Sequence, residues 1–254
     1  MDCVISSKEI TDLQARQILQ QIDIDHRYSY EILQPVHVDR TASMFIRSFC
    51  DSEPMTRYVN MDYDSFAPFA RAVVQKAAND GLSIVALDGG KVIACALTED
   101  IVDPLPMTFN VSPKFKYIFA LLEQLTSGFL HGKQFQKKHV AHLFITAVDE
   151  DYRKNGLSKQ VNFRAMSLAA DEGFSFMVSE LTNIYNELGI MHHLKNASLL
   201  LGSQVYREYT LDGVRPFANL PGGAAGYLWE LKCDALLTYT QDNILQKRTL
   251  RTFR

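Results

Sequence analysis

An apolar run, a glycine-containing turn and a helical repeat follow one another in the middle of the chain, and this order constrains the fold most. Residues 141–148, AHLFITAV, form a continuous apolar run of strand length, which is typical of a central strand covered on both faces. The turn DEDYRKNGLSKQ (149–160) follows directly, and FSFMVSEL (174–181) predicts another strand. Between them, up to Gly173, apolar residues recur at helical spacing: Leu157, Val161, Ala165, Leu168 and Ala169. The stretch therefore predicts a β-loop-α-β unit.

The residues around this unit predict further strands and helices. LSIVALDGGKVIACALTED (82–100) is typical of a β-hairpin, because a DGG turn joins two β-branched runs. Residues 101–138 open with Pro104 and Pro106 and then show one apolar helical face, and we interpret them as an excursion between strands. The other expected elements are helices at 7–22, 39–49, 65–79 and 184–196, and strands at 28–36, 203–210 and 225–233.

Composition limits the class of protein and the cellular compartment to be expected. With 47% hydrophobic and 22% charged residues, a chain of 254 residues can bury a sizeable core. A formal net charge of −3 gives no general reason to bind nucleic acid or a membrane surface, and the apolar runs are too short to span a bilayer. The four cysteines are scattered without a C-x-x-C pair, and the amino terminus lacks the basic and apolar segments of a secretory signal. We therefore expect a cytoplasmic protein, as a monomer or homodimer.

The turn at 149–160 has the features of a phosphate site. A helix that begins after a glycine presents unpaired backbone N–H groups and the positive end of its dipole. Gly156 lets a ligand approach the backbone, and Arg153 and Lys154 add positive charge. No G-x-G-x-x-G is present, and neither Gly-Lys pair continues into the Ser or Thr of a P-loop. The pattern R-x-x-G-x-S remains, and a plain βα turn with a solvated basic patch is the alternative interpretation.

The segment ITAVDEDYRKNGLSKQV resembles the acetyl-CoA-binding motif of the GNAT N-acetyltransferase superfamily, Q/R-x-x-G-x-G/A. Arg153, Gly156 and Ser158 stand at its three defining positions, and Ser158 departs from the usual glycine or alanine. The resemblance implies that the turn holds the pyrophosphate of acetyl-CoA through these residues and Lys154, Asn155 and Leu157. It also implies a mixed, mostly antiparallel sheet with helices on both faces and a splayed central pair of strands.

Two more segments are similar to one group within that superfamily, the arylalkylamine and dopamine N-acetyltransferases. FCDSEPMTRYV resembles their F-x-x-x-E-P-L loop, and VYREYTLDGVRPF resembles their Y-x-E-Y-x-x-D-G-x-x-x-F stretch. That group also has a helix-bearing excursion between the hairpin and the central strand. We therefore expect a helical extension at 1–25, an acetyltransferase domain at 26–234 with its excursion at 101–138, and a basic tail at 235–254.

The resemblance assigns two roles in acetyl transfer. An alkylamine is mostly protonated at neutral pH, so a base must remove a proton, and Glu53 matches the glutamate that does so in the similar enzymes. A backbone N–H of the central strand binds the oxyanion, and Ala147 or Val148 would supply it while pairing with the pantetheine arm. The alternatives are a solvated loop glutamate and two ordinary core residues.

The departing thiolate must gain a proton. The arylalkylamine enzymes carry serines just after the fifth strand, whereas ELTNIYNELG stands here and contains none. Tyr185 is the best local acid, since superfamily members often use a tyrosine on this helix. Asn183 is expected to hydrogen-bond the pantetheine. A half-buried aromatic and a helix cap are the structural alternatives for these two residues.

Other groups of polar and aromatic residues give weaker evidence of a functional site. His139 and His142 fall on opposite faces of a strand, and His192 and His193 point about 100° apart on a helix, so we expect no metal site. Four aromatic residues of the loop and second helix could line an amine pocket or simply pack in the core: Tyr58, Tyr63, Phe66 and Phe69.

The sequence therefore predicts one GNAT-type α/β domain that transfers the acetyl group of acetyl-CoA to the primary amine of a small molecule, arylalkylamine or polyamine-like. Two alternatives stay open. One is acetylation of a protein amino group, which requires a shallow, open cleft. The other is a non-catalytic regulator that binds acyl-CoA, which the missing serines favour.

Overall fold

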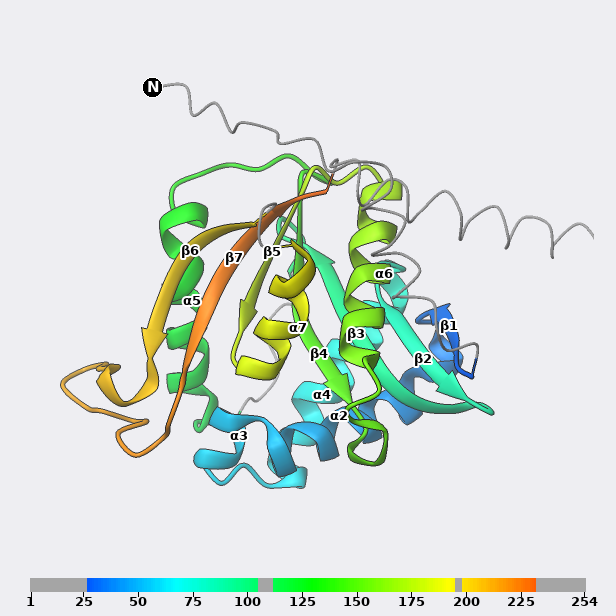
Figure 1. The fold of residues 1–254 in the computed structure, drawn as a ribbon. Coiled ribbons are helices and arrows are strands. Elements are labelled where there is room, and N and C mark those ends of the chain that lie inside the picture. Colours follow the sequence, from blue (N-terminus) through cyan, green and yellow to red (C-terminus); the bar gives the residue numbers. More distant parts are fainter. Residues whose placement is uncertain (1–26, 105–111, 195–197, 232–254) are drawn as a thin grey trace, which may run out of the picture.

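The computed structural model of the chain describes residues 27–104, 112–194 and 198–231. One sheet of seven strands forms its centre, in the order β1-β2-β3-β4-β5-β7-β6 (Figure 1). Neighbouring strands are antiparallel except for the parallel pair β4–β5. The strands are β1 Ser29–Ile32, β2 Ile84–Asp88, β3 Lys91–Asp100, β4 Val140–Val148, β5 Phe176–Leu181, β6 Ser198–Val205 and β7 Gly223–Glu230. The predicted helix at 7–22 and the basic tail lie outside the described residues.

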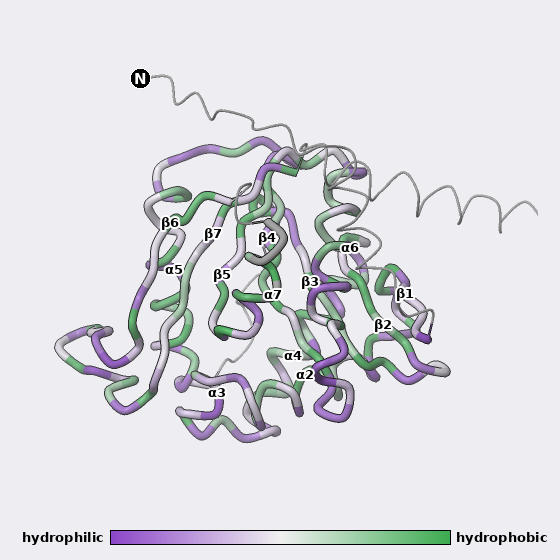
Figure 2. Tube along the Cα trace, viewed as in Figure 1, coloured by the Kyte–Doolittle hydropathy of each residue, from purple (hydrophilic) through white to green (hydrophobic). Residues whose placement is uncertain are grey.

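Helices cover both faces of this sheet. On one face lie α6 (Leu157–Asp171) and α7 (Ile184–Leu194), and on the other lie α2 (Val38–Ser52), α4 (Tyr63–Asp80) and α5 (Phe115–Leu130). A short helix, α3 (Pro54–Tyr58), follows α2. Green, hydrophobic residues are concentrated along the central strands in Figure 2. This is the mixed, mostly antiparallel α/β architecture that the sequence predicts.

Most of the predicted elements are present, and β6 is the main exception in position. It was expected at 203–210, whereas the strand spans Ser198–Val205 and the chain then turns through a 3₁₀ helix at Tyr206–Glu208. Tyr206 and Tyr209 are buried beside Phe217, because the turn directs both rings into an apolar cluster that includes residues of α5. Their apolar spacing therefore arises from core packing and is not the alternation of a strand.

The two central strands part, as the resemblance implies. β4 and β5 pair only at Val140↔Phe176, Ala141↔Met177 and His142↔Val178. On the β3 side, Leu97 pairs with Ile145 and Thr98 with Leu143, so Phe144 is an extra residue in a β-bulge of β4. Beyond the last pair, the buried hydroxyl of Ser179 donates to the Leu143 carbonyl at 2.6 Å. The bulge and this side-chain bond end the backbone pairing and leave the C-terminal parts of both strands separated.

Helix α5 lies unusually close to the strands beneath it. A Cβ atom built on Gly202 of β6 would lie 2.7 Å from the carbonyl oxygen of Leu125, and one on Gly226 of β7 would lie 2.9 Å from the same atom. Both contacts involve backbone, which cannot move aside as a side chain can. Only glycine therefore permits this close contact between α5 and the sheet.

We expect Gly202→Ala to lower the free energy of unfolding by about 1–3 kcal/mol, because overpacking of this kind forces backbone shifts. Urea unfolding followed by circular dichroism measures the effect. Gly128→Ala is the matched control: it lies on the exposed side of α5 with no atom within 4 Å of the added Cβ. Equal transition midpoints for Gly202→Ala and the wild type would contradict the close approach of α5.

Candidate functional site

A large cleft begins where β4 and β5 separate. Its volume is about 1510 Å³, and its walls come from the turn before α6, the two parted strands, the α2–α3 junction and the aromatic faces of α4 and α5. Nine of the eleven candidate residues line it: Glu53, Val148, Arg153, Lys154, Gly156, Leu157, Ser158, Asn183 and Tyr185. Ala147 and Asn155 do not. Residues that are far apart in sequence thus meet at one opening.

The turn before α6 has the geometry of an anion site. Gly156 adopts a left-handed conformation (φ 71°) as the N-cap, without a side-chain cap, and Lys154 is also left-handed (φ 64°). The backbone N–H groups of Leu157 and Ser158, in the first turn of α6, have no intrahelical acceptor. No atom lies within 4 Å of a Cβ built on Gly156, so a ligand can approach the backbone. The Asn155 amide donates to the Tyr152 carbonyl at 3.2 Å and shapes the turn itself.

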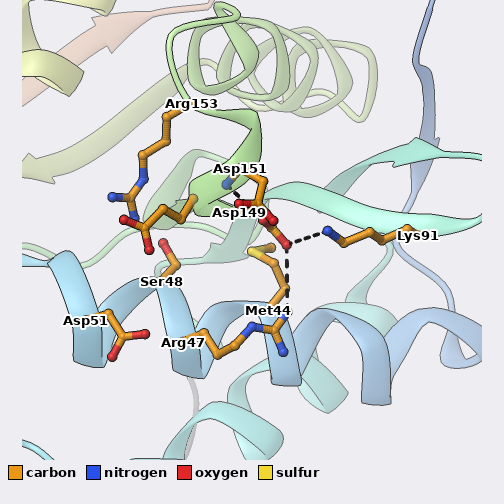
Figure 3. A pocket seen from close by; sticks show the side chains of 9 residues that line it. Met44, Arg47, Ser48, Asp51, Lys91, Asp149, Asp151 and Arg153 are labelled. Atoms are coloured by element: carbon orange, nitrogen blue, oxygen red, sulfur yellow. Dashed lines mark hydrogen bonds and ion pairs between the residues drawn. The ribbon is translucent and has the colours of Figure 1, made fainter.

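Ion pairs on the far side anchor this turn (Figure 3). The carboxylate of Asp149, which is buried, lies 3.1 Å from the Lys91 ammonium of β3 and 3.7 Å from the Arg47 guanidinium of α2. The hydroxyl of Tyr152 donates to Asp88 at 2.9 Å. A smaller polar pocket of about 250 Å³ lies here, and Arg153 extends into it toward α2. The β2–β3 hairpin and α2 therefore hold the turn in place without a ligand.

The backbone of β4 separates the two predicted oxyanion donors. The N–H of Asp149 donates to the Ile93 carbonyl at 2.8 Å, which makes Ala94↔Val148 a non-hydrogen-bonded pair. The backbone groups of Val148 therefore point away from β3, toward the cleft, whereas those of Ala147 point toward its partner Cys95. The Ser48 hydroxyl of α2 donates to the Val148 carbonyl at 3.1 Å. This geometry favours Val148 over Ala147 as a contact for a ligand in the cleft.

Glu53 is the N-cap of α3 and joins α2 to β5. Its Oε2 atom accepts from the Thr56 backbone N–H at 2.7 Å and from the Thr56 hydroxyl at 2.6 Å. Its Oε1 atom accepts from the Thr182 hydroxyl at 2.9 Å, just beyond β5. The Tyr206 hydroxyl donates to the Thr182 carbonyl at 2.6 Å, and burial, with the Glu53 charge, raises the pKa of Tyr206, which keeps this donor protonated.

These partners of Glu53 were not identified from the sequence. Thr56 follows Glu53 at the spacing of an N-cap hydrogen bond, so this contact could have been predicted from the sequence. Thr182 and Tyr206 had no local pattern, because they reach Glu53 only through the fold. Together they hold the carboxylate at the edge of the cleft.

Asn183 and Tyr185 lie at the start of α7, at the other side of the opening. The Asn183 side-chain carbonyl accepts from the Tyr185 backbone N–H at 2.8 Å, and the Asn183 backbone carbonyl accepts from Glu187 at 3.0 Å. Asn183 therefore caps α7 and is also one of the residues that line the cleft. The Tyr185 side chain is 81% exposed, so it stands at the mouth of the cleft and not in its interior.

Phenylalanine rings form the wall opposite the turn. Of the four aromatic residues proposed for an amine pocket, Phe66 and Phe69 line the cleft. Tyr58 instead packs on Phe217, and the Tyr63 hydroxyl donates to Asp51 at the surface. Four more rings complete the wall and were not identified from the sequence: Phe49, Phe115, Phe119 and Phe144.

His142 is part of a buried row of charged side chains that was not predicted from the sequence. Its Nε2 atom lies 2.8 Å from Glu180 of β5, and its Nδ1 atom lies 3.3 Å from Glu99 of β3. Although burial opposes the charge, the Glu180 carboxylate and the bond to Glu99 raise the pKa of His142 to about 10, so the ring is an imidazolium at neutral pH. His139 instead contacts the rings of Phe135 and Phe176. Among the described residues, no group of His, Cys, Asp or Glu could hold a metal ion.

Comparison with known proteins gives matches to solved structures alone. Neither a protein-family model nor a curated protein matches the sequence. The C-terminal condensation domain of Ebony, solved with β-alanyl-dopamine, superposes with a TM-score of 0.70 at 16% identity, over 80% of this chain and 98% of that domain. No helix within the described ranges has the length and hydropathy needed to cross a membrane.

Two amine acetyltransferases have the same fold. Arylalkylamine N-acetyltransferase 2 from Aedes aegypti matches with a TM-score of 0.66 at 19% identity, over 81% of this chain and 99% of that one. The Drosophila melanogaster polyamine N-acetyltransferase, which forms N-acetylagmatine, matches with a TM-score of 0.61 at 14% identity, over 80% of this chain and 99% of that one. The order of strands, the parting of β4 and β5 and these matches agree: this chain has the GNAT N-acetyltransferase fold, in the form found in the arylalkylamine enzymes.

Proposed function

We propose that the protein is an acetyl-CoA-dependent N-acetyltransferase that acts on the primary amine of a small molecule. The observation that carries this proposal is the meeting of three features in one cleft: the phosphate turn at Gly156, the outward-facing backbone of Val148 and the carboxylate of Glu53. The similar solved proteins include enzymes whose names state arylalkylamine or polyamine acetylation, which supports the same chemistry here.

The thioester substrate would bind along the open edge of β4. In this proposal, the backbone N–H groups at Gly156, Leu157 and Ser158 bind the pyrophosphate, aided by Arg153 and Lys154. The pantetheine amides pair with the Val148 backbone and with the Asn183 side-chain amide. The pantetheine arm thus takes the place of the missing backbone pairing between β4 and β5. The acetyl group then lies beside the open edge of β4.

The transfer itself requires protons to leave the nitrogen and one proton to reach the sulfur. The amine loses a proton to Glu53, and its lone pair attacks the thioester carbonyl carbon. Charge develops on the carbonyl oxygen, and a backbone N–H of the open β4 edge, with Val148 the candidate, stabilises it. As the C–S bond breaks, the thiolate takes a proton from Tyr185 or from water at the cleft mouth, and the second proton that the nitrogen loses as the amide forms replaces it. The products are the N-acetyl amine and free CoA thiol.

The lining of the cleft favours a small aromatic amine over a protein amino group. Six phenylalanine rings form one wall, and carboxylates lie beside it, which suits an acceptor with an aryl body and a cationic end. A protein terminus would require a shallow groove, whereas this cavity extends beneath the strands to the α4 and α5 faces.

The function can be tested by incubating the full chain with acetyl-CoA and a panel of amines, and following thiol release with a chromogenic disulfide reagent. Thiol release that depends on an amine such as 2-phenylethylamine, agmatine or spermidine is the expected result. A peptide panel in parallel detects the protein-acetylating alternative. CoA binding by calorimetry without release for any amine or peptide would contradict catalysis and favour the acyl-CoA-binding regulator.

A further inference from the structure

A row of three charged side chains crosses the sheet at the level where β4 and β5 part. Glu99 of β3 and Val178 of β5 are the direct neighbours of His142 across the strands, and Glu180 follows Val178 on the same face. The side chains of Glu99, His142 and Glu180 are 9%, 19% and 8% exposed. His142 lies between the two carboxylates, at 3.3 Å and 2.8 Å. Each ring nitrogen of this imidazolium is thus occupied by one glutamate.

Glu180 is the member of this row that reaches the cleft. It is one of the cleft-lining residues, although its side chain is largely buried. Within the part of the chain that the structure describes, His142 is bonded to its Oε2 atom, and its Oε1 atom has no protein donor. The Oε1 atom keeps some exposure to solvent, since among the described residues it is not a fully buried polar atom without a partner. A fixed carboxylate oxygen is therefore presented to whatever occupies the cleft.

The position of Glu180 relates it to Glu53. Glu180 and Thr182 are alternate residues of one extended segment, so they share a face and lie roughly 7 Å apart along it. The Thr182 hydroxyl holds Glu53, so both carboxylates border the same part of the cleft. Phe144, whose ring centroid is 5.6 Å from that of His142, continues the aromatic wall to this point. A molecule with its aryl group on that wall would bring its polar end between the two glutamates.

A purely structural role does not explain this row well. A partly buried ion pair contributes little net stability compared with apolar side chains of similar size, because desolvation offsets the attraction. Charged groups held by specific partners at the floor of a cleft are instead typical of binding sites. His142 and Glu99 would keep Glu180 in one orientation. The Oε1 atom of Glu180 is then a hydrogen-bond acceptor suited to a positively charged N–H donor.

We propose that Glu180, oriented by His142 and Glu99, binds the ammonium group of the acceptor and restricts the acceptor to cationic amines. This inference rests on the proposed function, since it assigns the amine end of the same cleft. Glu53 removes the proton, whereas Glu180 provides the charge that selects the amine and holds its nitrogen. Glu180 is thus a specificity-determining residue in addition to the proposed base.

Calorimetry with a charged and a neutral ligand of equal shape tests this role. The full chain, saturated with CoA, is titrated with 2-phenylethylamine and with 2-phenylethanol at pH 7.5. The wild type is expected to bind the amine at least about tenfold more tightly, since a hydrogen bond to a charged group contributes that much or more. Glu180→Gln, which keeps the size and removes the charge, is expected to weaken amine binding about tenfold or more and leave alcohol binding within twofold. Glu208→Gln, the same change at an exposed residue near Arg207, is the control and alters neither affinity.

Two results would overturn the assignment. One is an unchanged ratio of amine to alcohol affinity in Glu180→Gln. The other is equal affinity of the two compounds for the wild type, which decides the matter even if the variant fails to fold. If an amine is nevertheless acetylated in the thiol-release assay, only the role of Glu180 fails. If no amine is bound or acetylated by the wild type, the proposed function fails together with it.

Discussion

Glu53→Gln is expected to lower the turnover number for amine acetylation by about 10²–10⁴-fold, the usual contribution of a positioned general base. Glutamine has the same shape, and its amide oxygen can still accept the Thr56 backbone N–H that now lies 2.7 Å from Oε2. The α3 cap and the fold therefore persist, while the proton acceptor is lost. Thiol release at saturating acetyl-CoA and amine measures the change, and calorimetry is expected to show CoA affinity within twofold of the wild type.

Asp62→Asn is the matched control for this substitution. Asp62 is also an N-cap carboxylate, at α4, where it accepts from the Ser65 backbone N–H at 2.8 Å, but it does not line the cleft. Its replacement changes the charge at a helix start in the same way and is expected to leave turnover unchanged. If Glu53→Gln retains wild-type turnover, another group accepts the proton and the role assigned to Glu53 is wrong.

Gly156→Trp is expected to weaken CoA binding by at least about 100-fold. A side chain at this N-cap would cover the backbone N–H groups that begin α6, which are the proposed pyrophosphate contacts. The left-handed φ of 71° adds strain for any residue other than glycine, so some loss of stability accompanies the loss of binding. Isothermal titration with CoA, at a temperature where circular dichroism shows the variant folded, measures the effect.

The opposite end of the same helix provides the control. Gly173 follows α6, is also left-handed (φ 94°), and has no atom within 4 Å of a built Cβ. Gly173→Trp therefore introduces comparable backbone strain without covering the start of the helix. CoA affinity close to that of the wild type is expected for Gly173→Trp. Retained affinity in Gly156→Trp would instead show that the phosphate turn is not the CoA site.

Local patterns predicted the elements around the site well, because their causes are local. The apolar run before Asp149, the glycine at 156 and the helical repeat up to Gly173 correspond to β4, the N-cap and α6. The DGG turn after Leu87 likewise joins β2 to β3. Hydrophobic period and turn residues depend on neighbours within a few positions, so the sequence contains them directly.

Features that depend on register could not be predicted in this way. The extra residue Phe144 that ends the β4–β5 pairing becomes visible only when Leu97 and Thr98 are matched to their partners. His142 had been considered only as a metal ligand with His139, since its two glutamates come from strands on either side. The same limit applies to β6, where buried tyrosines of a 3₁₀ turn resembled the alternation of a strand.

The sequence by itself determined the class of fold, the place of the turn before α6 that is proposed to bind phosphate, and the residue proposed as base, because each depends on a short motif. Only the tertiary structure decided what surrounds them. The hydrogen bond between Glu53 and Thr182 joins residues 129 positions apart, and the row from Glu99 to Glu180 requires three strands in register. Contacts of this kind depend on how elements pack, and packing is set by the sum of many weak interactions over the whole core. No single stretch of sequence contains that sum.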